Sequence, residues 1–217
     1  MPERTASLFE RLAERYDAWY DSPAGRATFA AEVACLAPLL RGLPQPWLEV
    51  GVGGGRFAEA LGVGWGVDPA RAPLLLAAAR GILPVQAVGE RLPLRGGSCG
   101  AVLVVVTLCF ADDPAALLVE ARRVLGEGGG VVLGEVPADS PLGRHYRDRG
   151  AEGHPFYSAA RFVGRTETLE LLRRAGLRPV RARSTLLQTP SKAPRPGHAV
   201  DGEDPEAGFV GWLAVPA

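Results

Sequence analysis

The chain has 217 residues, of which 47% are hydrophobic and 22% are charged, and its formal net charge is zero. This length and composition are typical of one globular domain around a single core. Without a net positive charge there is no global field that would attract nucleic acid or an anionic membrane surface, so neither partner is expected. The longest apolar run, residues 101–111, is too short to cross a bilayer.

The three cysteines, Cys35, Cys99 and Cys109, stand far apart in the chain. No cysteine or histidine pair has the spacing of a zinc site, and an odd number of cysteines does not suggest a disulfide framework. We therefore expect buried, reduced cysteines and no bound metal. The N-terminus begins without the apolar segment of a signal peptide, which favours a cytoplasmic location.

The first 45 residues are expected to form a helical cap. Apolar residues recur at steps of three and four along residues 7–21, and the same spacing returns along residues 27–40. This period places the apolar side chains of each segment on one face of a helix. Two amphipathic helices are therefore predicted before the central part of the chain.

Strands and helices then alternate over residues 46–136. The strands are predicted at residues 47–50, 64–67, 83–88, 101–106 and 131–136, and the helices at residues 56–61, 70–80 and 114–125. Residues 101–106 are nearly all branched and aliphatic, as in a parallel strand that is buried on both faces. Such alternation implies right-handed crossovers and a mostly parallel sheet.

The alternation ends after Pro137. Residues 137–165 are polar and aromatic and are interpreted as a substrate-side insertion. Residues 166–217 are expected to supply a C-terminal helix at 166–176 and strands at 179–187 and 209–215, with a mobile loop over 188–208. The predicted fold is a single α/β domain over residues 1–217. It is a Rossmann-like three-layer sandwich with a mostly parallel seven-stranded sheet and an antiparallel last strand.

A glycine-rich loop follows the first predicted strand, with Gly51, Gly53 and Gly55 at alternate positions. Between a strand and a helix, such a loop lets backbone N–H groups approach a ligand closely. Arg56 stands where a dinucleotide fingerprint has its third glycine, and Glu49 precedes the loop where dinucleotide sites are usually apolar. An acid at that position suits a ligand with an ammonium group, such as the methionine end of S-adenosylmethionine.

Asp68 ends the second predicted strand, where a carboxylate is placed to accept both hydroxyls of a ribose. Nicotinamide sites share this position, so Asp68 alone does not discriminate between cofactors. A purely structural glycine turn and a helix-capping aspartate are the alternatives for these two features. Together, in a βαβ context, the loop and Asp68 favour nucleotide binding.

The glycine loop and Asp68 belong to a series of segments that stand in a fixed order along the chain, at residues 48–55, 66–69, 89–94, 98–107 and 123–129. They resemble the successive motifs of class I S-adenosylmethionine-dependent methyltransferases of the small-molecule, type 11-like branch. The resemblance covers about residues 47–136, and the flanking residues 16–20 and 25–26 look like those of the same branch. Two departures are visible, because Val88 stands where many relatives carry an acid, and Cys99-Gly100 replaces a Phe-Asp pair.

The resemblance implies S-adenosylmethionine as cofactor and S-adenosylhomocysteine as product. Tyr16 and Tyr20 are expected to close over the cofactor, with simple helix packing as the alternative for these aromatics, and Arg26 is expected to pair with the cofactor carboxylate. Cofactor contacts are implied at Tyr16, Arg26, Glu49, Gly51, Gly53, Gly55, Asp68, Pro69, Gly89, Glu90 and Thr107. Val88 can only pack against the adenine, which leaves adenine recognition to backbone groups near Gly89 and Glu90.

Methyl transfer is an in-line displacement of an already activated methyl group, so the protein mainly positions the acceptor and excludes water. A general base is needed only for an acceptor that is protonated at the attacking atom, and no motif identifies a catalytic residue. The acceptor pocket is expected above the carboxyl ends of the strands. Its candidate lining residues are Tyr20, His145, Tyr146, His154 and Tyr157. For each of these histidines, an exposed position in a surface loop is the alternative.

The sequence therefore predicts methylation of an unidentified small molecule at nitrogen, oxygen or carbon, by a monomer or homodimer. A non-catalytic regulatory protein that binds S-adenosylmethionine or S-adenosylhomocysteine is the alternative, against which the aromatic insertion argues. A nicotinamide-dependent oxidoreductase is disfavoured by Glu49 and by Arg56.

Overall fold

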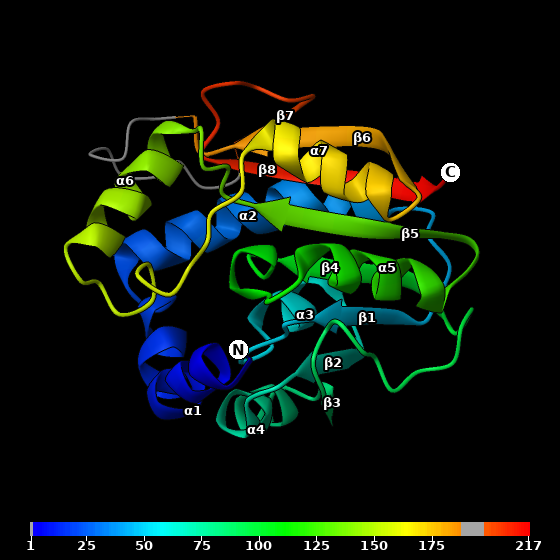
Figure 1. The fold of residues 1–217 in the computed structure, drawn as a ribbon, viewed down its shortest axis with the longest axis horizontal. Coiled ribbons are helices and arrows are strands. Elements are labelled where there is room, and N and C mark those ends of the chain that lie inside the picture. The colour runs from blue at the N-terminus through cyan, green and yellow to red at the C-terminus, as the bar shows by residue number, and fades with distance from the viewer. Residues whose placement is uncertain (1, 188–197) are drawn as a thin grey trace.

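The computed structural model describes residues 2–187 and 198–217. Within them the strands form one sheet in the order β3-β2-β1-β4-β5-β8-β6-β7 (Figure 1). Strands β1 to β5 are parallel, and β8 runs antiparallel to both of its neighbours, β5 and β6. The strands are β1 Trp47–Val50, β2 Trp65–Asp68, β3 Leu83–Gln86, β4 Cys99–Val105, β5 Leu125–Glu135, β6 Leu177–Thr185, β7 Ala199–Asp201 and β8 Phe209–Pro216.

The predicted fold class is confirmed, with one strand more than expected. The additional strand, β7, pairs antiparallel with the outer edge of β6, where Arg183 faces Asp201. It lies within residues 188–208, which were predicted as a mobile loop, although residues 188–197 of that segment are outside the described residues. Three residues carry too little alternation to predict a strand, so β7 depends on the unpaired edge that β6 offers.

The helices cover the two faces of the sheet in separate layers. Helices α2, α3 and α4 pack on one face, and α5 and α7 pack together on the other (Figure 1). The helices are α1 Pro2–Trp19, α2 Pro23–Leu40, α3 Arg56–Leu61, α4 Arg71–Ala79, α5 Pro114–Val124, α6 Pro141–Ala151 and α7 Arg165–Arg174, with a 3₁₀ turn, η1, at Leu108–Phe110. This is the three-layer sandwich that the alternation predicts.

Strand β4 contributes side chains to the cores on both faces of the sheet. Every residue of β4 is buried, and its side chains alternate between the two layers because successive residues of a strand point to opposite faces. Leu103 belongs to the core beneath α2, whereas Val102 and Val104 belong to the core beneath α5 and α7. The run of branched residues therefore serves two cores at once.

Three helix starts, those of α2, α5 and α6, share one local signal. Ser22, Asp113 and Ser140 each precede a proline at the first helical position, and each side chain accepts a hydrogen bond from a backbone N–H of the first turn. The same signal begins α6 inside the insertion, for which no helix was predicted. Helix α6 was not predicted because residues 141–151 are mostly charged or glycine and carry no apolar stripe.

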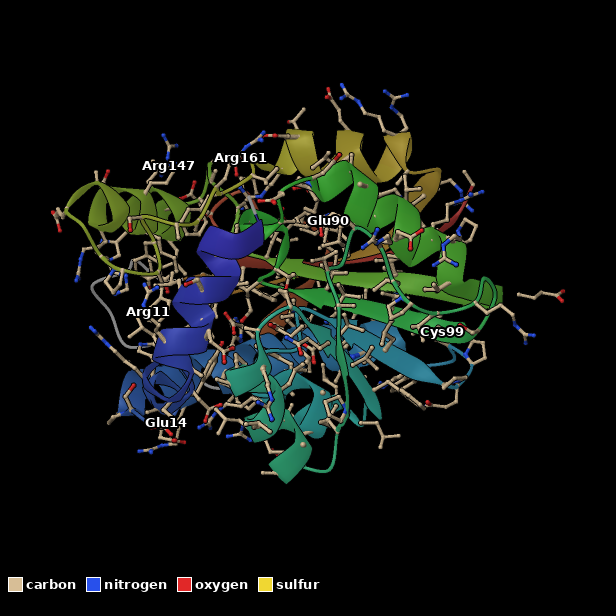
Figure 2. All side chains as sticks on the ribbon, turned by 60° about the horizontal axis from the view of Figure 1, so that its bottom comes forward. Arg11, Glu14, Glu90, Cys99, Arg147 and Arg161 are labelled. Carbon is tan, nitrogen blue, oxygen red and sulfur yellow. The ribbon has the colours of Figure 1, made fainter. Side chains whose placement is uncertain are left out.

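Helices α1 and α6 lie beyond the carboxyl ends of the parallel strands, where a ligand is expected in this class of fold (Figure 1). The charged side chains of Arg11, Glu14 and Arg147 point outward at that end, and Cys99 lies at the opposite end of the sheet (Figure 2). In the described part of the chain, none of the helices combines the length and the apolar character that a membrane crossing requires.

Candidate functional site

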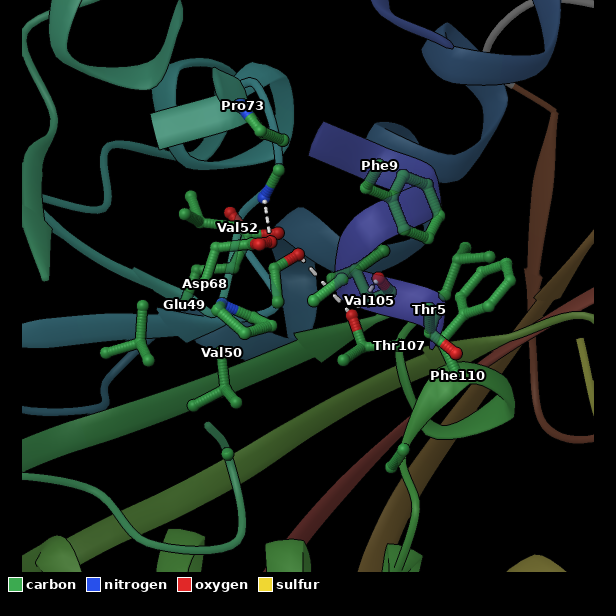
Figure 3. Close-up of a pocket in the computed structure, with 18 of the residues that line it drawn as sticks. Thr5, Phe9, Glu49, Val50, Val52, Asp68, Pro73, Val105, Thr107 and Phe110 are labelled. Atoms are coloured by element: carbon green, nitrogen blue, oxygen red, sulfur yellow. Dashed lines mark hydrogen bonds between the residues drawn. The ribbon is translucent and has the colours of Figure 1, made fainter. Parts of the chain in front are cut away.

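A cavity opens between α1 and the carboxyl ends of β1, β2 and β4. It is lined by α1, by the glycine loop and by the segments that follow β2, β3 and β4 (Figure 3). Glu49 and Asp68 lie on one side of the cavity, and Phe9 and Phe110 lie on the other (Figure 3). Most of the predicted cofactor residues line this cavity, namely Tyr16, Glu49, Gly51, Gly53, Asp68, Pro69, Gly89, Glu90 and Thr107.

The glycine loop has a backbone that requires glycine. Gly51, Gly53 and Gly55 all have positive φ, at 73°, 50° and 82°, a region that other residues enter only at a cost. A Cβ atom on Gly51 would lie 2.3 Å from the Thr107 side chain, whereas a Cβ atom on Gly53 would enter open space. Gly53 therefore brings its backbone to the cavity with nothing of the protein in front of it.

Glu49 carries an unsatisfied carboxylate oxygen at this cavity. The residue is 2% exposed, and its Oε2 atom has no hydrogen-bond partner among the described residues. Burial raises the pKa of Glu49 well above its usual value, a hydrogen bond from the Ala58 backbone opposes this, and the nearby Asp68 charge adds to it. A buried acceptor without a donor is costly, so this oxygen suits a positively charged donor that a ligand supplies.

Asp68 organises the loop and still faces the cavity. Its Oδ2 atom accepts a hydrogen bond from Gly53 N at 3.0 Å, and its Oδ1 atom accepts one from Ala70 N at 2.9 Å. Each carboxylate oxygen keeps a further lone pair. Burial is the main cause that raises the pKa of Asp68 to about 6, with a further contribution from the charge of Glu10.

Glu90 is held by the loop after η1. Its carboxylate accepts hydrogen bonds from Asp112 N at 3.0 Å and from Asp113 N at 3.3 Å. This arrangement fixes the segment after β3 against the start of α5. Val88 and Gly89 line the same cavity wall. The position at which many relatives carry an acid therefore presents the apolar side chain of Val88 to the cavity.

Helix α1 covers the cavity and is fastened there by ion pairs. Asp17 contacts both Arg56 and Arg80 at 2.7 Å, and Arg56 also contacts Asp21 at 2.7 Å. Arg56 was interpreted only as the absence of a third glycine, but the structure gives it a role in joining α1 to α3. Phe9 of α1 adds an apolar wall, with its ring centroid 5.1 Å from that of Phe110.

A second cavity adjoins the first and shares Tyr16, Tyr20 and Val106 with it. Aromatic rings from α1 and from the insertion form most of its wall. The Tyr157 ring stacks on Tyr146 at 4.2 Å and on His154 at 4.1 Å between centroids. The remaining lining residues are Arg15, Trp19, Thr28, Glu32, Val136 and Phe156. Four of the five predicted acceptor residues, all except His145, are therefore brought together.

Val106 stands at the boundary of the two cavities in a strained conformation. Its φ is 48°, which is rare for a β-branched residue, and its N–H donates to Gly134 O at 2.7 Å. Strain of this kind is found at ligand sites more often than elsewhere in proteins.

Three of the predicted site residues line neither cavity. Arg26 is exposed and donates to the backbone carbonyl of Asp21. Gly55 is buried behind the loop, and a Cβ there would lie 3.0 Å from Ala77. His145 is exposed on α6. In residues 2–187 and 198–217, no three His, Cys, Asp or Glu side chains come together in a way that would hold a metal ion.

Phe9, Asp17, Phe110 and Glu32 line the cavities but were not singled out as site residues from the sequence. Asp17 acts through arginines that lie 39 and 63 positions away in the chain, so no local pattern reveals it. Glu32 had one visible signal, because it is the only acid in the mostly apolar helix α2.

The sheet order, the glycine loop and the cavity over the carboxyl strand ends define a Rossmann-like α/β protein of the nucleotide-binding type. A family model described as a methyltransferase domain matches residues 48–133. The chain belongs to the class I S-adenosylmethionine-dependent methyltransferases.

Two curated relatives are uncharacterized. One, from Mycobacterium tuberculosis, is 47% identical over 216 residues, which are 99% of this chain and 75% of the relative. Another, from Methanocaldococcus jannaschii, is 33% identical over 183 residues, which are 84% of this chain and 86% of the relative.

A crystal structure from Thermotoga maritima is 32% identical with a TM-score of 0.88, and the match covers 98% of this chain and 100% of that one. That protein is described as an S-adenosylmethionine-dependent methyltransferase and a possible histamine N-methyltransferase.

Proposed function

We propose that this protein transfers a methyl group from S-adenosylmethionine to a small-molecule acceptor. The observation that carries the proposal is the pair of adjoining cavities. The first has the unsatisfied Glu49 oxygen beside a glycine loop, and the second is walled by aromatic rings from the insertion. One cavity provides for the cofactor and the other for an acceptor, with Tyr16 and Tyr20 common to both.

The residues of the first cavity fit S-adenosylmethionine. Glu49 would take the ammonium group, since its free oxygen is buried and lacks a donor. Asp68 would take the ribose hydroxyls with its remaining lone pairs, and Gly53 leaves room for close approach to the loop. The cofactor supplies a methyl group that is already activated on a sulfonium.

The second cavity would orient the acceptor and keep water out. Tyr146, His154 and Tyr157 form one continuous stack, a rigid apolar surface that positions a small molecule at little entropic cost. The neighbour from Thermotoga maritima is described as a possible histamine N-methyltransferase, which supports an acceptor of small size. The nitrogen, oxygen or carbon atom that receives the methyl group is not assigned.

The two alternative functions have less support. A nicotinamide cofactor would bring a pyrophosphate towards the loop, where a second acid beside Asp68 is unfavourable. A purely regulatory protein that binds the cofactor would not need the second cavity. A single domain over the whole chain accords with the single sheet but stays a prediction. The cytoplasmic location and the monomeric or dimeric state also stay predictions.

Thermal unfolding with added ligands tests the cofactor assignment. S-adenosylhomocysteine at about 100 times its Kd should stabilise the fold by about 2.7 kcal/mol, which for a chain of this size raises the Tm by roughly 5–10 °C. NAD⁺ at the same concentration should leave the Tm unchanged. Stabilisation by NAD⁺ and not by S-adenosylhomocysteine would contradict the proposal.

A further inference from the structure

Glu32 of α2 is a buried acid in the wall of the second cavity. It is 4% exposed. No hydrogen bond or ion pair joins its carboxylate to any of residues 2–187 and 198–217. This sets it apart from Glu135, a second buried acid, which accepts a hydrogen bond from the Thr168 hydroxyl and lies outside both cavities.

The tyrosines around Glu32 pack against each other through their rings. The Tyr20 ring lies edge-on to that of Tyr16, 5.9 Å away between centroids, and the Tyr157 ring stacks on that of Tyr146 at 4.2 Å. The aromatic wall therefore presents ring surfaces to the cavity and leaves the Glu32 carboxylate as its unpartnered acid. Aromatic faces together with a carboxylate form the kind of surface that attracts a cation.

The charge of Glu32 has a high cost when the cavity holds no cation. An isolated buried carboxylate loses its hydration and protonates instead, and burial raises the pKa of Glu32 to about 8. Arg15 lines the same cavity, but it is exposed, so water and salt screen its charge. A ligand that brings its own positive charge restores the ionised carboxylate.

We propose that Glu32 binds a cationic amine of the methyl acceptor inside the second cavity, so that the acceptor belongs to the class of small amines. This inference rests on the proposed methyltransferase function and names the acceptor class for it. Glu32 is here a recognition residue, which forms an ion pair with the ammonium group and is not assigned a part in bond making.

Binding of such an amine must release a proton. The free carboxyl is mostly protonated at pH 7, the bound carboxylate is ionised, and the proton goes to the buffer. The other groups that face Glu32 have pKa values raised by burial and stay neutral near pH 7: Tyr16, Tyr20, Cys35, Tyr146 and Tyr157. His154 has a pKa lowered by burial and by the charges of Arg149 and Arg15. Between pH 7 and 9, Glu32 is therefore the group of this cavity that titrates.

Calorimetry on the protein saturated with S-adenosylhomocysteine tests this inference. The probes are primary amines of increasing size, from butylamine to 2-phenylethylamine, each compared with the alcohol of the same skeleton. The wild-type protein should bind at least one amine more tightly than its alcohol, and in two buffers of different ionisation enthalpy it should release about one proton at pH 7. Glu32→Gln should weaken that amine on the order of 30-fold or more and abolish the proton release.

Glu135→Gln is the matched control, since it also removes a buried acid with a pKa near 8 but should change neither amine binding nor proton release. Failure of S-adenosylhomocysteine to bind the wild-type protein overturns the proposed function itself. If that ligand binds, two results overturn the amine inference alone. One is that no amine is preferred over its alcohol, and the other is that Glu32→Gln keeps the preference and the proton release.

Discussion

Gly53 is the position at which the cofactor site can be blocked with least damage to the fold. A Cβ atom there meets no protein atom within 4 Å, although its φ of 50° is unfavourable for alanine. Gly53→Ala should therefore cost about 1–2 kcal/mol in stability and place a methyl group where the ligand approaches the loop. We predict that S-adenosylhomocysteine no longer raises the Tm of this variant.

Gly97→Ala is the control for Gly53→Ala, because it introduces the backbone strain without changing the cavity. Gly97 also has a positive φ, 73°, and open space around its Cβ position, but it lies in neither cavity. This variant should lose similar stability and keep the full ligand-induced rise in Tm. Equal responses of the two variants to the ligand would argue against our placement of the cofactor at the loop.

Single residues differ in how far the sequence predicts them. Glu49, Gly53 and Asp68 were predicted because the geometry of a strand, a loop and a helix is local, and the structure places all three on one cavity. Asp17 and Glu32 acquire their importance from distant contacts and from burial. An acid in an amphipathic or apolar helix can point either way, so its position alone does not distinguish a solvent-exposed side chain from one inside a cavity.

Helix α1 depends on ion pairs for its position over the first cavity. Although burial opposes ionisation, hydrogen bonds from Arg56 and Arg80 hold the pKa of Asp17 below its usual value. The charged form is thus favoured above that value, and the fastening is lost as the pH falls through the depressed pKa. The side chain of Asp17 is 14% exposed, so these are partly sheltered pairs and stronger than ordinary surface pairs.

We predict that Asp17→Asn loosens α1 and weakens cofactor binding together. Loss of the charge weakens three hydrogen bonds from two arginines and should cost about 1–3 kcal/mol, which appears as faster hydrogen exchange of residues 5–19 and a higher Kd for S-adenosylhomocysteine. Glu14→Gln removes an exposed acid from the same helix and serves as the control. Unchanged exchange in Asp17→Asn would mean that packing of Phe9 and Tyr16, and not the ion pairs, holds the helix.

Elements were predictable where they carry a periodic apolar face. The strands β1 to β5 and the helices around them follow from that pattern, and the structure has them in the predicted order, although β5 begins at Leu125 and not at 131, and β3 ends at Gln86 and not at 88. Helix α6 is less apolar, with Leu142 and Tyr146 packed against the core, and it begins at the cap that Ser140 provides. Strand β7 is stabilised by pairing with the edge of β6, a contact that the local sequence of β7 does not predict.

At the scale of the whole molecule, two adjoining cavities are formed by different parts of the fold. The parallel sheet fixes the first cavity at its carboxyl ends, while the consecutive helices α1 and α2 and the distant insertion enclose the second. Fold class and family were predictable from the ordered motifs because the sheet geometry determines them. For the second cavity, Tyr20, Tyr146, His154 and Tyr157 were named from the sequence, but Glu32 was not, because its burial depends on tertiary packing.

Transfer of a labelled methyl group decides whether the two cavities work together. The wild-type protein is incubated with S-adenosylmethionine that carries an isotopic label on its methyl group, together with fractionated small metabolites, and labelled product and S-adenosylhomocysteine are quantified. We predict that at least one fraction yields labelled product and S-adenosylhomocysteine in equal amounts, and that Gly53→Ala yields neither. Binding of S-adenosylhomocysteine without acceptor-dependent turnover in any fraction would contradict the account and favour a non-catalytic role.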